Sequence, residues 1–315
     1  MSTTTTRRSQ AGAAAVTERR SQVDVVKHRR KRVEPAFYLM LVPALVLFTL
    51  LIIGPALAGI FFSVTNYVGY GQYSFIGLKN YQVLLTDPRI LASYGFTLGF
   101  SVVTVVLVNA IALFLAILLN AKIKFKTALR GVFFIPMVIS GIVIAYVFNY
   151  IFSTSLPSLF TSIGIPAWSS SILANEDWAW VAIVIVSAWQ AIPGALIIYL
   201  AGLLAIPEEV YEASALDGAG PWRQFTSVTL PLVAGYVVIN TVLGFKGFLN
   251  TYDIIVGLTN GGPGTATSSV AMTIFTGFTS GDYAYQMANA VVFFIITVVI
   301  SVLQLRIINR RGVSL

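Results

Sequence analysis

The sequence predicts an all-α, polytopic membrane protein with six transmembrane helices. Its 315 residues are 57% hydrophobic and only 10% charged, and the mean hydropathy is +0.83. An average soluble domain carries roughly 25% charged residues, so a water-soluble chain of this composition would lack the polar surface to cover its core. Long apolar stretches and an uneven distribution of Lys and Arg support the same fold class. Lipid is therefore the expected solvent for most of the chain.

Six apolar stretches are long enough for transmembrane helices. A helix needs about 20 residues to cross roughly 30 Å of hydrocarbon at about 1.5 Å per residue. A membrane β-barrel would instead show short segments of alternating polarity, so that architecture is not expected. The expected spans are residues 37–63, 93–120, 131–152, 179–205, 229–250 and 284–306.

The basic residues predict which ends of the spans face the cytoplasm. With the amino terminus inside, the outer loops hold only Lys79 and Arg89, and Lys246 falls within the fifth span. Both termini are then cytoplasmic, beside anionic lipid headgroups. This bias explains the net charge of +8 without a nucleic-acid partner. The other 17 of the 20 Lys and Arg residues lie in the expected cytoplasmic segments 1–36, 121–130, 206–228 and 306–315.

Two segments outside the membrane domain of residues 37–306 are expected to be cytoplasmic tails. Residues 1–36 are basic and rich in Thr, Ser and Ala, and they lack the apolar content to fold, so we expect a disordered tail. The apolar run that follows is too long for a cleaved signal peptide. Residues 307–315 form the second tail.

The residue types that metal and nucleophilic chemistry need are nearly missing. The chain has no cysteine and one histidine, His28, which lies among Arg and Lys in the first tail. We therefore expect no catalytic site, no metal site and no enzyme activity. The Gly-rich residues 260–264 lack the GK[ST] ending of a P-loop and lie on the outer side, so a tight turn is favoured over a phosphate cradle. Without an ATP-binding motif, the chain is expected to hold no cofactor.

The cytoplasmic segment 206–231 predicts two short helices joined by a turn. Pro207 suits the first helical turn, and the acidic residues after it favour that turn's positive end. Asp217 and Gly218 end this helix, with the glycine available for a left-handed cap. A second helix begins at Pro221, and the fifth span follows it.

This helical pair can rest either on lipid or on a protein partner. Amphipathic helices that bind lipid favour basic residues on the polar face. The first helix is instead acidic, and anionic lipids repel acidic side chains. A cytoplasmic protein partner is therefore the favoured interpretation, and a lipid-bound pair is the alternative. The acidic residues are Glu208, Glu209, Glu212 and Asp217.

The same segment resembles the EAA loop of binding-protein-dependent ABC importer permeases. That motif reads EAA, three residues, Gly, nine residues, then I-x-L-P. This chain departs from it mildly, with Ser214 in place of the third residue and Val228 in place of Ile. The matching positions are Glu212, Ala213, Ser214, Gly218, Val228, Leu230 and Pro231.

The resemblance extends over about residues 37–311 and is to the carbohydrate-uptake permeases similar to the maltose and glycerol-3-phosphate systems. The sequence Asn-Gly-Gly-Pro at 260–263 is typical of the first-type permease of a heterodimeric pair. The solute stays open among disaccharide, oligosaccharide, polyol and glycerol phosphate. The other supporting motifs are residues 41–44 (LVPA), 75–81 (FIGLKNY) and 133–136 (FFIP).

The resemblance implies a permease subunit in a bacterial inner membrane that forms half of a sugar pathway. A second permease completes the pathway, a cytoplasmic ATPase dimer binds ATP and Mg, and an extracytoplasmic solute-binding protein delivers the sugar. Glu212 is the candidate charge partner of the ATPase, and Gly218 is needed for the backbone shape. The implied ATPase-coupling residues are Glu212, Ala213, Ser214, Asp217, Gly218 and Pro231.

Two helical stripes are candidates for the solute pathway. Gln190 and Thr251 can bind sugar hydroxyls, and Phe248 can stack on a sugar ring. Helix packing explains the Gly and Ala positions equally well. The stripes are Ser187, Gln190, Ala191 and Gly194 in the fourth span, and Gly244, Gly247, Phe248 and Thr251 in the fifth. The candidate pathway residues are Ser187, Gln190, Gly194, Gly247, Phe248, Asn250 and Thr251.

Lys246 is a separate candidate, because a charged residue within the membrane is costly and is usually functional. It shares a stripe with Asn250 and Asp253. Three interpretations stay open: contact with an anionic solute, an ion pair with a partner subunit, or a side chain that extends to the interface.

A secondary active transporter of a small polar solute is the alternative function. Such proteins tend to have more spans, internal repeats and buried acidic residues. None of the 12 acidic residues falls clearly inside an expected span, so the importer is favoured. A membrane-embedded enzyme is a weaker alternative, because the chain has so few reactive side chains.

Overall fold

The structure is a computed structural model that describes residues 35–121, 124–165 and 169–310, and these residues are helical or form connecting loops. Within them, the one pairing of extended backbone is an isolated bridge between Thr65 and Phe75. The predicted all-α class is confirmed. Residues 1–34 and 311–315 of the two expected tails lie outside the described residues.

The chain divides into two compact units, Met1–Pro55 and Ala56–Leu315. The first contains α2 (Pro35–Phe48) and η1 (Thr49–Ile53), and α3 (Gly54–Phe62) begins in it. The second contains all later elements. Its longest helices are α5 (Pro88–Asn120), α9 (Ala179–Leu204), α13 (Ala234–Leu249) and α16 (Tyr283–Arg310).

Five helical segments of the described chain are long and apolar enough to cross a membrane, and a bent pair makes up to six. The expected six-span fold is therefore confirmed at the level of five to six spans. The five segments are Leu39–Phe62, Pro88–Asn120, Gly141–Ser162, Ala179–Leu204 and Tyr283–Arg306, and the bent pair is Pro221–Leu232 with Ala234–Leu249.

Small residues let the central helices pack closely. Ala112 and Ala116 of α5 are fully buried, as is Ala182 of α9. Near the end of α9, Gly202 lies directly beneath the ring of Tyr236 from α13. Lipid tails are as apolar as the helices, so association in a membrane relies on such close packing rather than on the hydrophobic effect.

Polar side chains inside this bundle are hydrogen-bonded. The buried hydroxyls of Thr97, Ser101 and Thr104 each donate to the carbonyl four residues earlier in α5, at 2.7 Å. The Tyr199 hydroxyl of α9 donates to Asn109 Oδ1 of α5. Asn240 of α13 donates to the Ala195 carbonyl of α9 at 3.1 Å. The Tyr199 and Asn240 bonds connect α5, α9 and α13, and the three hydroxyl bonds satisfy polar groups within α5.

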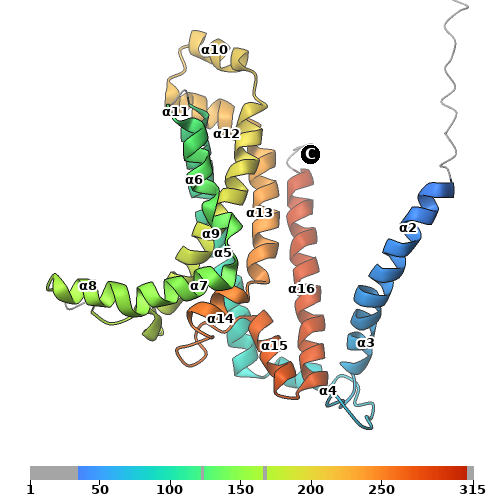
Figure 1. Cartoon of the computed structure of the whole chain (residues 1–315). Coiled ribbons are helices and arrows are strands. Elements are labelled where there is room, and N and C mark those ends of the chain that lie inside the picture. Colours follow the sequence, from blue (N-terminus) through green and yellow to red (C-terminus); the bar gives the residue numbers. More distant parts are fainter. Residues whose placement is uncertain (1–34, 122–123, 166–168, 311–315) are drawn as a thin grey trace, which may run out of the picture. The chain divides into compact units, whose positions relative to one another are not determined.

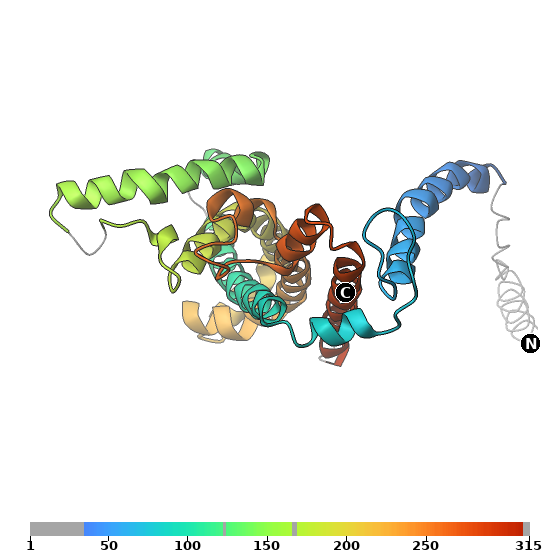
Figure 2. The ribbon, with the colours of Figure 1, turned by 90° about the horizontal axis from the view of Figure 1, so that it is seen from below.

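The third expected span is wrong in its boundaries. Instead of one helix over residues 131–152, α6 (Lys126–Val138) ends before Ile139, whose backbone is extended (φ −86°, ψ 137°). A new helix begins at Gly141 and continues through α7 (Gly141–Tyr150), η2 (Ile151–Ser155) and α8 (Leu156–Ser162). Figures 1 and 2 show that α7 and α8 run sideways from the bundle, across the direction of α5 and α9. Pro136, which cannot donate a helical hydrogen bond, comes just before the break.

The entry into the fifth span also differs from the prediction. The expected fifth span begins at residue 229, but the helix that starts at Pro221 continues past that point. It runs through α11 (Pro221–Gln224), η5 (Phe225–Thr229) and α12 (Leu230–Leu232). The chain then bends by 62° and continues as α13. The bend falls at Val233, two residues after Pro231, so Pro231 lies inside the helical segment that precedes the bend.

The two ends of the bundle carry different loops (Figure 1). One end, the α10 end, holds α10 (Glu208–Leu216), α11 and the carboxyl end of α16. The opposite end, the α15 end, holds α4 (Lys79–Leu84) and α15 (Val270–Thr279). The helical pair within 206–231, which the sequence assigns to the cytoplasm, lies at the α10 end, and α4 and α15, which lie in segments that it assigns to the outside, lie at the α15 end (Figure 1).

The contact between Gly202 and Tyr236 predicts different effects for two glycine substitutions in α9. A Cβ at Gly202 would lie 2.6 Å from the Tyr236 ring, so we expect Gly202→Ala to destabilise the protein by about 1–3 kcal/mol. A Cβ at Gly194 would meet nothing within 4 Å, so Gly194→Ala should be neutral or stabilise by up to about 1 kcal/mol through helix propensity. Thermal unfolding in detergent checks both, and equal melting temperatures would contradict the packing argument.

Candidate functional site

Two cavities with polar and apolar lining residues lie beside α9. The first, the Ser187 cavity, has a volume of about 280 Å³ and the second, the Gly141 cavity, about 420 Å³. They share Gln190, Thr251 and Ile254, so they adjoin. The Ser187 cavity is otherwise lined by Met137, Ser187, Ala191, Gly247 and Phe248, and the Gly141 cavity by Gly141, Asn250, Tyr252 and Asp253.

Most of the candidate pathway residues meet at these cavities, although they come from two different spans. Gly194 is the exception: it lines neither cavity and has open space next to it. The pathway role of the whole set stays a prediction. The six that line a cavity are Ser187, Gln190, Gly247, Phe248, Asn250 and Thr251.

Both cavities lie where helices are interrupted. One interruption is at Ile139 and Ser140, between α6 and α7. The other is residues 250–252, between α13 and α14 (Asp253–Leu258). Irregular backbone at membrane depth is tolerated only where protein covers it or where it lines a water-filled cavity. The expected third span ran across the first break, although Pro136 and the Ser140-Gly141 pair were signals for it, whereas the second break begins at residue 250, where the expected fifth span ends.

Gln190 connects α9 to the first interruption. Its Nε2 donates to the Ile139 carbonyl at 3.1 Å. Its side-chain amide would also lie 3.5–3.6 Å from a Cβ placed on Gly141. One amide N–H therefore satisfies a carbonyl that the helix break has left free, and Gln190 keeps its Oε1 for another partner.

Ser187 carries a buried hydroxyl without a partner. The residue is 2% exposed, and no described group hydrogen-bonds to its Oγ. Leaving a buried polar group unpaired costs about 1–3 kcal/mol, so such a group calls for an explanation. Since Ser187 lines a cavity, a hydroxyl of a bound molecule or a water in that cavity can satisfy it.

Phe248 lines the Ser187 cavity, whereas Lys246, whose role the sequence leaves open, lines neither cavity. The Phe248 ring is 8% exposed and packs edge-to-face on Phe100 with centroids 6.0 Å apart, so only part of it reaches the cavity. Lys246 is exposed in the last turn of α13 and lines neither cavity. Asn250 and Asp253 of its stripe do line the Gly141 cavity, and the Asn250 amide donates to the Lys246 carbonyl at 2.9 Å.

A second candidate site, at the α10 end, is the helical pair of residues 206–231. Gly218 has φ +76°, the left-handed conformation that the sequence predicts after Asp217. Ala219 N donates to the Ser214 carbonyl and Gly218 N to the Ala215 carbonyl, both at 3.0 Å. This pair of bonds is a Schellman cap, which ends α10 sharply and satisfies two terminal carbonyls.

The surface of α10 is available to a partner. Glu212, Ala213, Asp217 and Gly218 are exposed, as is Pro231, while Ser214 is half-buried. Two apolar side chains stand beside this acidic surface, Leu216 at 90% exposure and Trp222 at 76%. Large exposed apolar side chains next to a charged surface are typical of protein interfaces.

Tyr211 attaches α10 to the helix below it, which the sequence analysis missed. Its hydroxyl lies 3.2 Å from Thr229 Oγ1 of η5. Its carbonyl accepts from Ser214 Oγ at 2.9 Å and from Gln224 Nε2 at 3.5 Å. An aromatic residue one position before Glu212 was the available signal. Tyr211 therefore connects α10 to the helix that leads into α13.

The Gly-rich residues 260–264 form the tight turn that the sequence favours. Asn260, Gly261 and Gly264 all have positive φ, at 48°, 83° and 56°. Gly261 N donates to Thr259 Oγ1 at 3.3 Å and Gly262 N to the Thr259 carbonyl at 2.9 Å. These N–H groups are used within the turn, so they do not form a cradle for phosphate.

Comparisons with known proteins agree with this architecture. The model of the family described as "Binding-protein-dependent transport system inner membrane component" matches residues 108–312. The multiple sugar-binding transport system permease protein MsmF of Streptococcus mutans is 35% identical over 258 residues, covering 81% of this chain and 89% of that protein. The probable starch degradation products transport system permease protein AmyD of Thermoanaerobacterium thermosulfurigenes is 32% identical, covering 89% and 96%.

A solved structure shares the fold. It is a bacterial alginate ABC transporter in complex with an alginate pentasaccharide-bound periplasmic protein. One of its chains aligns with a TM-score of 0.78 over 89% of this chain and 96% of its own length, at 19% identity. The arrangement of helices described above is therefore that of a known transporter subunit.

The unpaired Ser187 hydroxyl predicts an unusual response to truncation. Ser187→Ala removes a buried, unsatisfied group, so the melting temperature of the protein without ligand should stay the same or rise. The matched control is Ser101→Ala, which removes a buried hydroxyl bonded at 2.7 Å and should cost about 1 kcal/mol. A larger loss for Ser187→Ala than for Ser101→Ala would show that Ser187 has a partner.

Proposed function

The chain belongs to the family of binding-protein-dependent transport system inner membrane components, and from this premise we propose that it forms half of the pathway of an ATP-driven sugar importer. The proposed solute is a di- or oligosaccharide or a related polyol. The names of MsmF and AmyD support a carbohydrate, and the chain spans 89% and 96% of the length of these two relatives.

The observation that carries this proposal is the pair of cavities around Gln190 and Thr251. Polar groups line them at the interruptions of two spans, where a solute can meet backbone and side-chain groups together. A sugar presents many hydroxyls, each able to donate and accept. The amide of Gln190, the hydroxyls of Ser187 and Thr251 and the amide of Asn250 are suitable partners for them.

The proposed partners follow from what the chain itself contains. Its sequence has no Walker A motif, so a partner ATPase must bind ATP and Mg. The acidic and apolar surface of α10 is the proposed contact with that ATPase. A second permease completes the pathway, and an external binding protein delivers the sugar. The alginate transporter, which was solved in complex with a periplasmic protein, supports this last partner.

The proposed coupling uses α10 as a lever. ATP binding moves the ATPase surface, and α10 follows because its capped end at Gly218 and its Tyr211 contact keep it rigid. The helix from Pro221 to Leu232 transmits this movement to α13, which carries Gly247 and Phe248 to the Ser187 cavity. Access to the cavity then changes with the nucleotide state.

The general experiment is reconstitution of the complete importer in proteoliposomes. Uptake of maltose, trehalose or another neutral sugar should require ATP inside, the partner ATPase and the binding protein. Uptake that is driven by a proton gradient and needs no ATPase would instead support a secondary transporter and would overturn the proposal.

Gln190→Ala should reduce this uptake. The substitution removes an amide from both cavities and frees the Ile139 carbonyl. Losing one or two hydrogen bonds of about 1 kcal/mol each predicts a transport rate lower by about fivefold to thirtyfold. The control is Gln304→Ala in α16, outside both cavities, which should transport at the normal rate. Equal rates for the two variants would exclude Gln190 from the pathway.

Gly218→Val should uncouple ATP hydrolysis from uptake. A β-branched residue is strained at φ +76°, so the cap opens and α10 loses its rigid end. ATPase activity should persist while sugar uptake falls. The matched control is Gly220→Val, because Gly220 has φ −70° in the same turn and tolerates a side chain. Normal uptake by the Gly218→Val importer would contradict the lever.

A further inference from the structure

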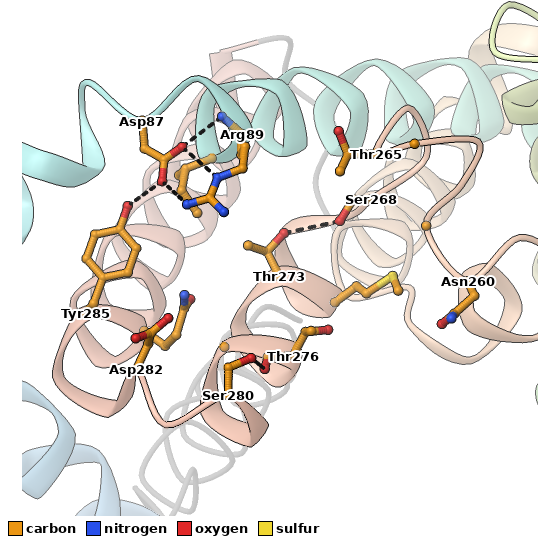
Figure 3. Close-up of a pocket in the computed structure, with 16 residues that line it drawn as sticks. Asp87, Arg89, Asn260, Thr265, Ser268, Thr273, Thr276, Ser280, Asp282 and Tyr285 are labelled. Carbon is orange, nitrogen blue, oxygen red and sulfur yellow. Dashed lines mark hydrogen bonds and ion pairs between the residues drawn. The ribbon is translucent and has the colours of Figure 1, made fainter. Parts of the chain in front are cut away.

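A third cavity lies at the α15 end (Figure 1). Figure 3 shows this outer pocket, whose volume is about 310 Å³. It shares no lining residue with the Ser187 or Gly141 cavities. Its walls come from the start of α5, the loop at 260–268, α15 and the start of α16.

An ion pair forms one wall of the outer pocket. Asp87 caps α5 by accepting from Arg89 N at 2.9 Å, and it also accepts from Arg89 Nη2 at 3.2 Å and from the Tyr285 hydroxyl at 3.2 Å. The hydrogen bond from the Arg89 side chain holds the pKa of the Asp87 carboxyl below its usual value. Arg89 is 80% exposed and its Nη1 has no described partner, so it can still donate into the pocket.

The opposite wall is a firmly bonded loop. Thr267 Oγ1 donates to the Gly262 carbonyl at 2.7 Å and contacts Thr259 Oγ1 at 2.8 Å. Val270 N, at the start of α15, donates to Thr97 Oγ1 of α5 at 3.0 Å. On the α15 side, Gly277 leaves no room for a Cβ, because the Gln286 side chain lies directly against it. The pocket therefore has fixed walls on several sides.

Several polar groups that line the pocket have unused hydrogen-bonding capacity. Within the described residues, no side-chain hydrogen bond forms at Asn260, Thr265, Thr276 or Asp282, and all four line the pocket. Figure 3 shows Asp282 and Thr276 on the side opposite Arg89. A carboxylate accepts, a guanidinium donates, and amides and hydroxyls do both. Such a mixture complements a molecule with several neighbouring hydroxyls.

The charge of the pocket narrows the chemistry of the ligand. Asp87 and Asp282 carry two negative charges against the single positive charge of Arg89, so the lining is net negative. Since Arg89 is already paired with Asp87, an anionic solute meets an unpaired carboxylate at Asp282. This arrangement favours a neutral polyhydroxylated ligand over a sugar acid or a sugar phosphate.

We propose that the outer pocket is a second carbohydrate-binding site, which holds a neutral sugar at the outer end of the chain before it moves inward. This inference rests on the proposed sugar-import function and extends it to a site outside the mid-bundle cavities. Little structure separates the outer pocket from the Ser187 cavity. Ser268 lines the outer pocket. The hydroxyl of the next residue, Ser269, donates at 3.2 Å to the carbonyl of Thr251, which lines the Ser187 cavity.

Cysteine protection tests this site directly, because the natural chain has no cysteine. In the assembled importer in nanodiscs, Thr276→Cys places one thiol of this chain in the pocket, and Thr279→Cys places one on the exposed surface of the same helix outside it. We expect maltose or trehalose to slow maleimide labelling of Thr276→Cys several-fold without the binding protein, and to leave Thr279→Cys unchanged. Thr265→Cys with the control Ala266→Cys repeats the comparison on the loop.

Removing a charge from the outer pocket provides a second test. Asp282→Asn keeps a side chain that can cap α16 but removes the carboxylate that accepts hydrogen bonds from the sugar. The sugar concentration that halves the labelling rate of Thr276→Cys should therefore rise about tenfold. Glycerol 3-phosphate should protect less than the neutral sugars in the unsubstituted pocket.

The outcomes separate the site from the proposed function. If the wild-type importer takes up maltose or trehalose but neither protects Thr276→Cys and Thr265→Cys, the outer site is refuted and sugar import stands. If only the sugar-free binding protein protects them, the pocket receives a side chain of that protein and the proposal is also wrong. If the wild-type importer takes up no sugar at all, the proposed function itself is wrong.

Discussion

The central constraint on this structure is that backbone groups inside a membrane need partners. Two interruptions, at Ile139–Ser140 and at residues 250–252, break the regular helical hydrogen bonding, and groups there find individual partners: Thr251 N donates to the Phe248 carbonyl, and Ser269 Oγ donates to the Thr251 carbonyl. The Ile139 carbonyl is satisfied by Gln190 of α9, and two cavities open beside the interruptions. Continuous helices would satisfy their own backbone, so these interruptions call for protein cover or for a cavity that they line, and both cavities lie at them.

The sequence predicts the long elements well because length and charge suffice for them. The single helices α5, α9 and α16 lie close to their expected limits, since nothing interrupts their apolar runs. The expected third span failed, because hydropathy averages over Pro136, Ser140 and Gly141 and cannot register one extended residue. The cap at Gly218 was predictable, because it depends only on the backbone conformation of that residue, a positive φ that favours glycine.

The candidate site was predictable where it depends on the spacing of residues along a single helix. Helical spacing grouped Ser187 with Gln190 and Gly247 with Thr251, and the fold brings both pairs to one cavity. Spacing also included Gly194, which lies one helical turn too far, and it could not show that Phe248 packs on Phe100. The contact of Gln190 with the Ile139 carbonyl joins residues 51 positions apart, and the outer pocket joins α5 to α16, so both depend on tertiary structure alone.

The proposed mechanism connects three places along the bundle: the outer pocket, the two cavities at the helix interruptions, and the α10 surface. Its central claim is that a sugar occupies the cavities beside Gln190. The most direct measurement is a structure of the assembled importer trapped with ATP, a hydrolysis-deficient ATPase and maltose. We expect sugar density within hydrogen-bonding distance of Gln190 and Thr251. Density for side chains of the second permease filling these cavities, with the sugar elsewhere, would contradict it.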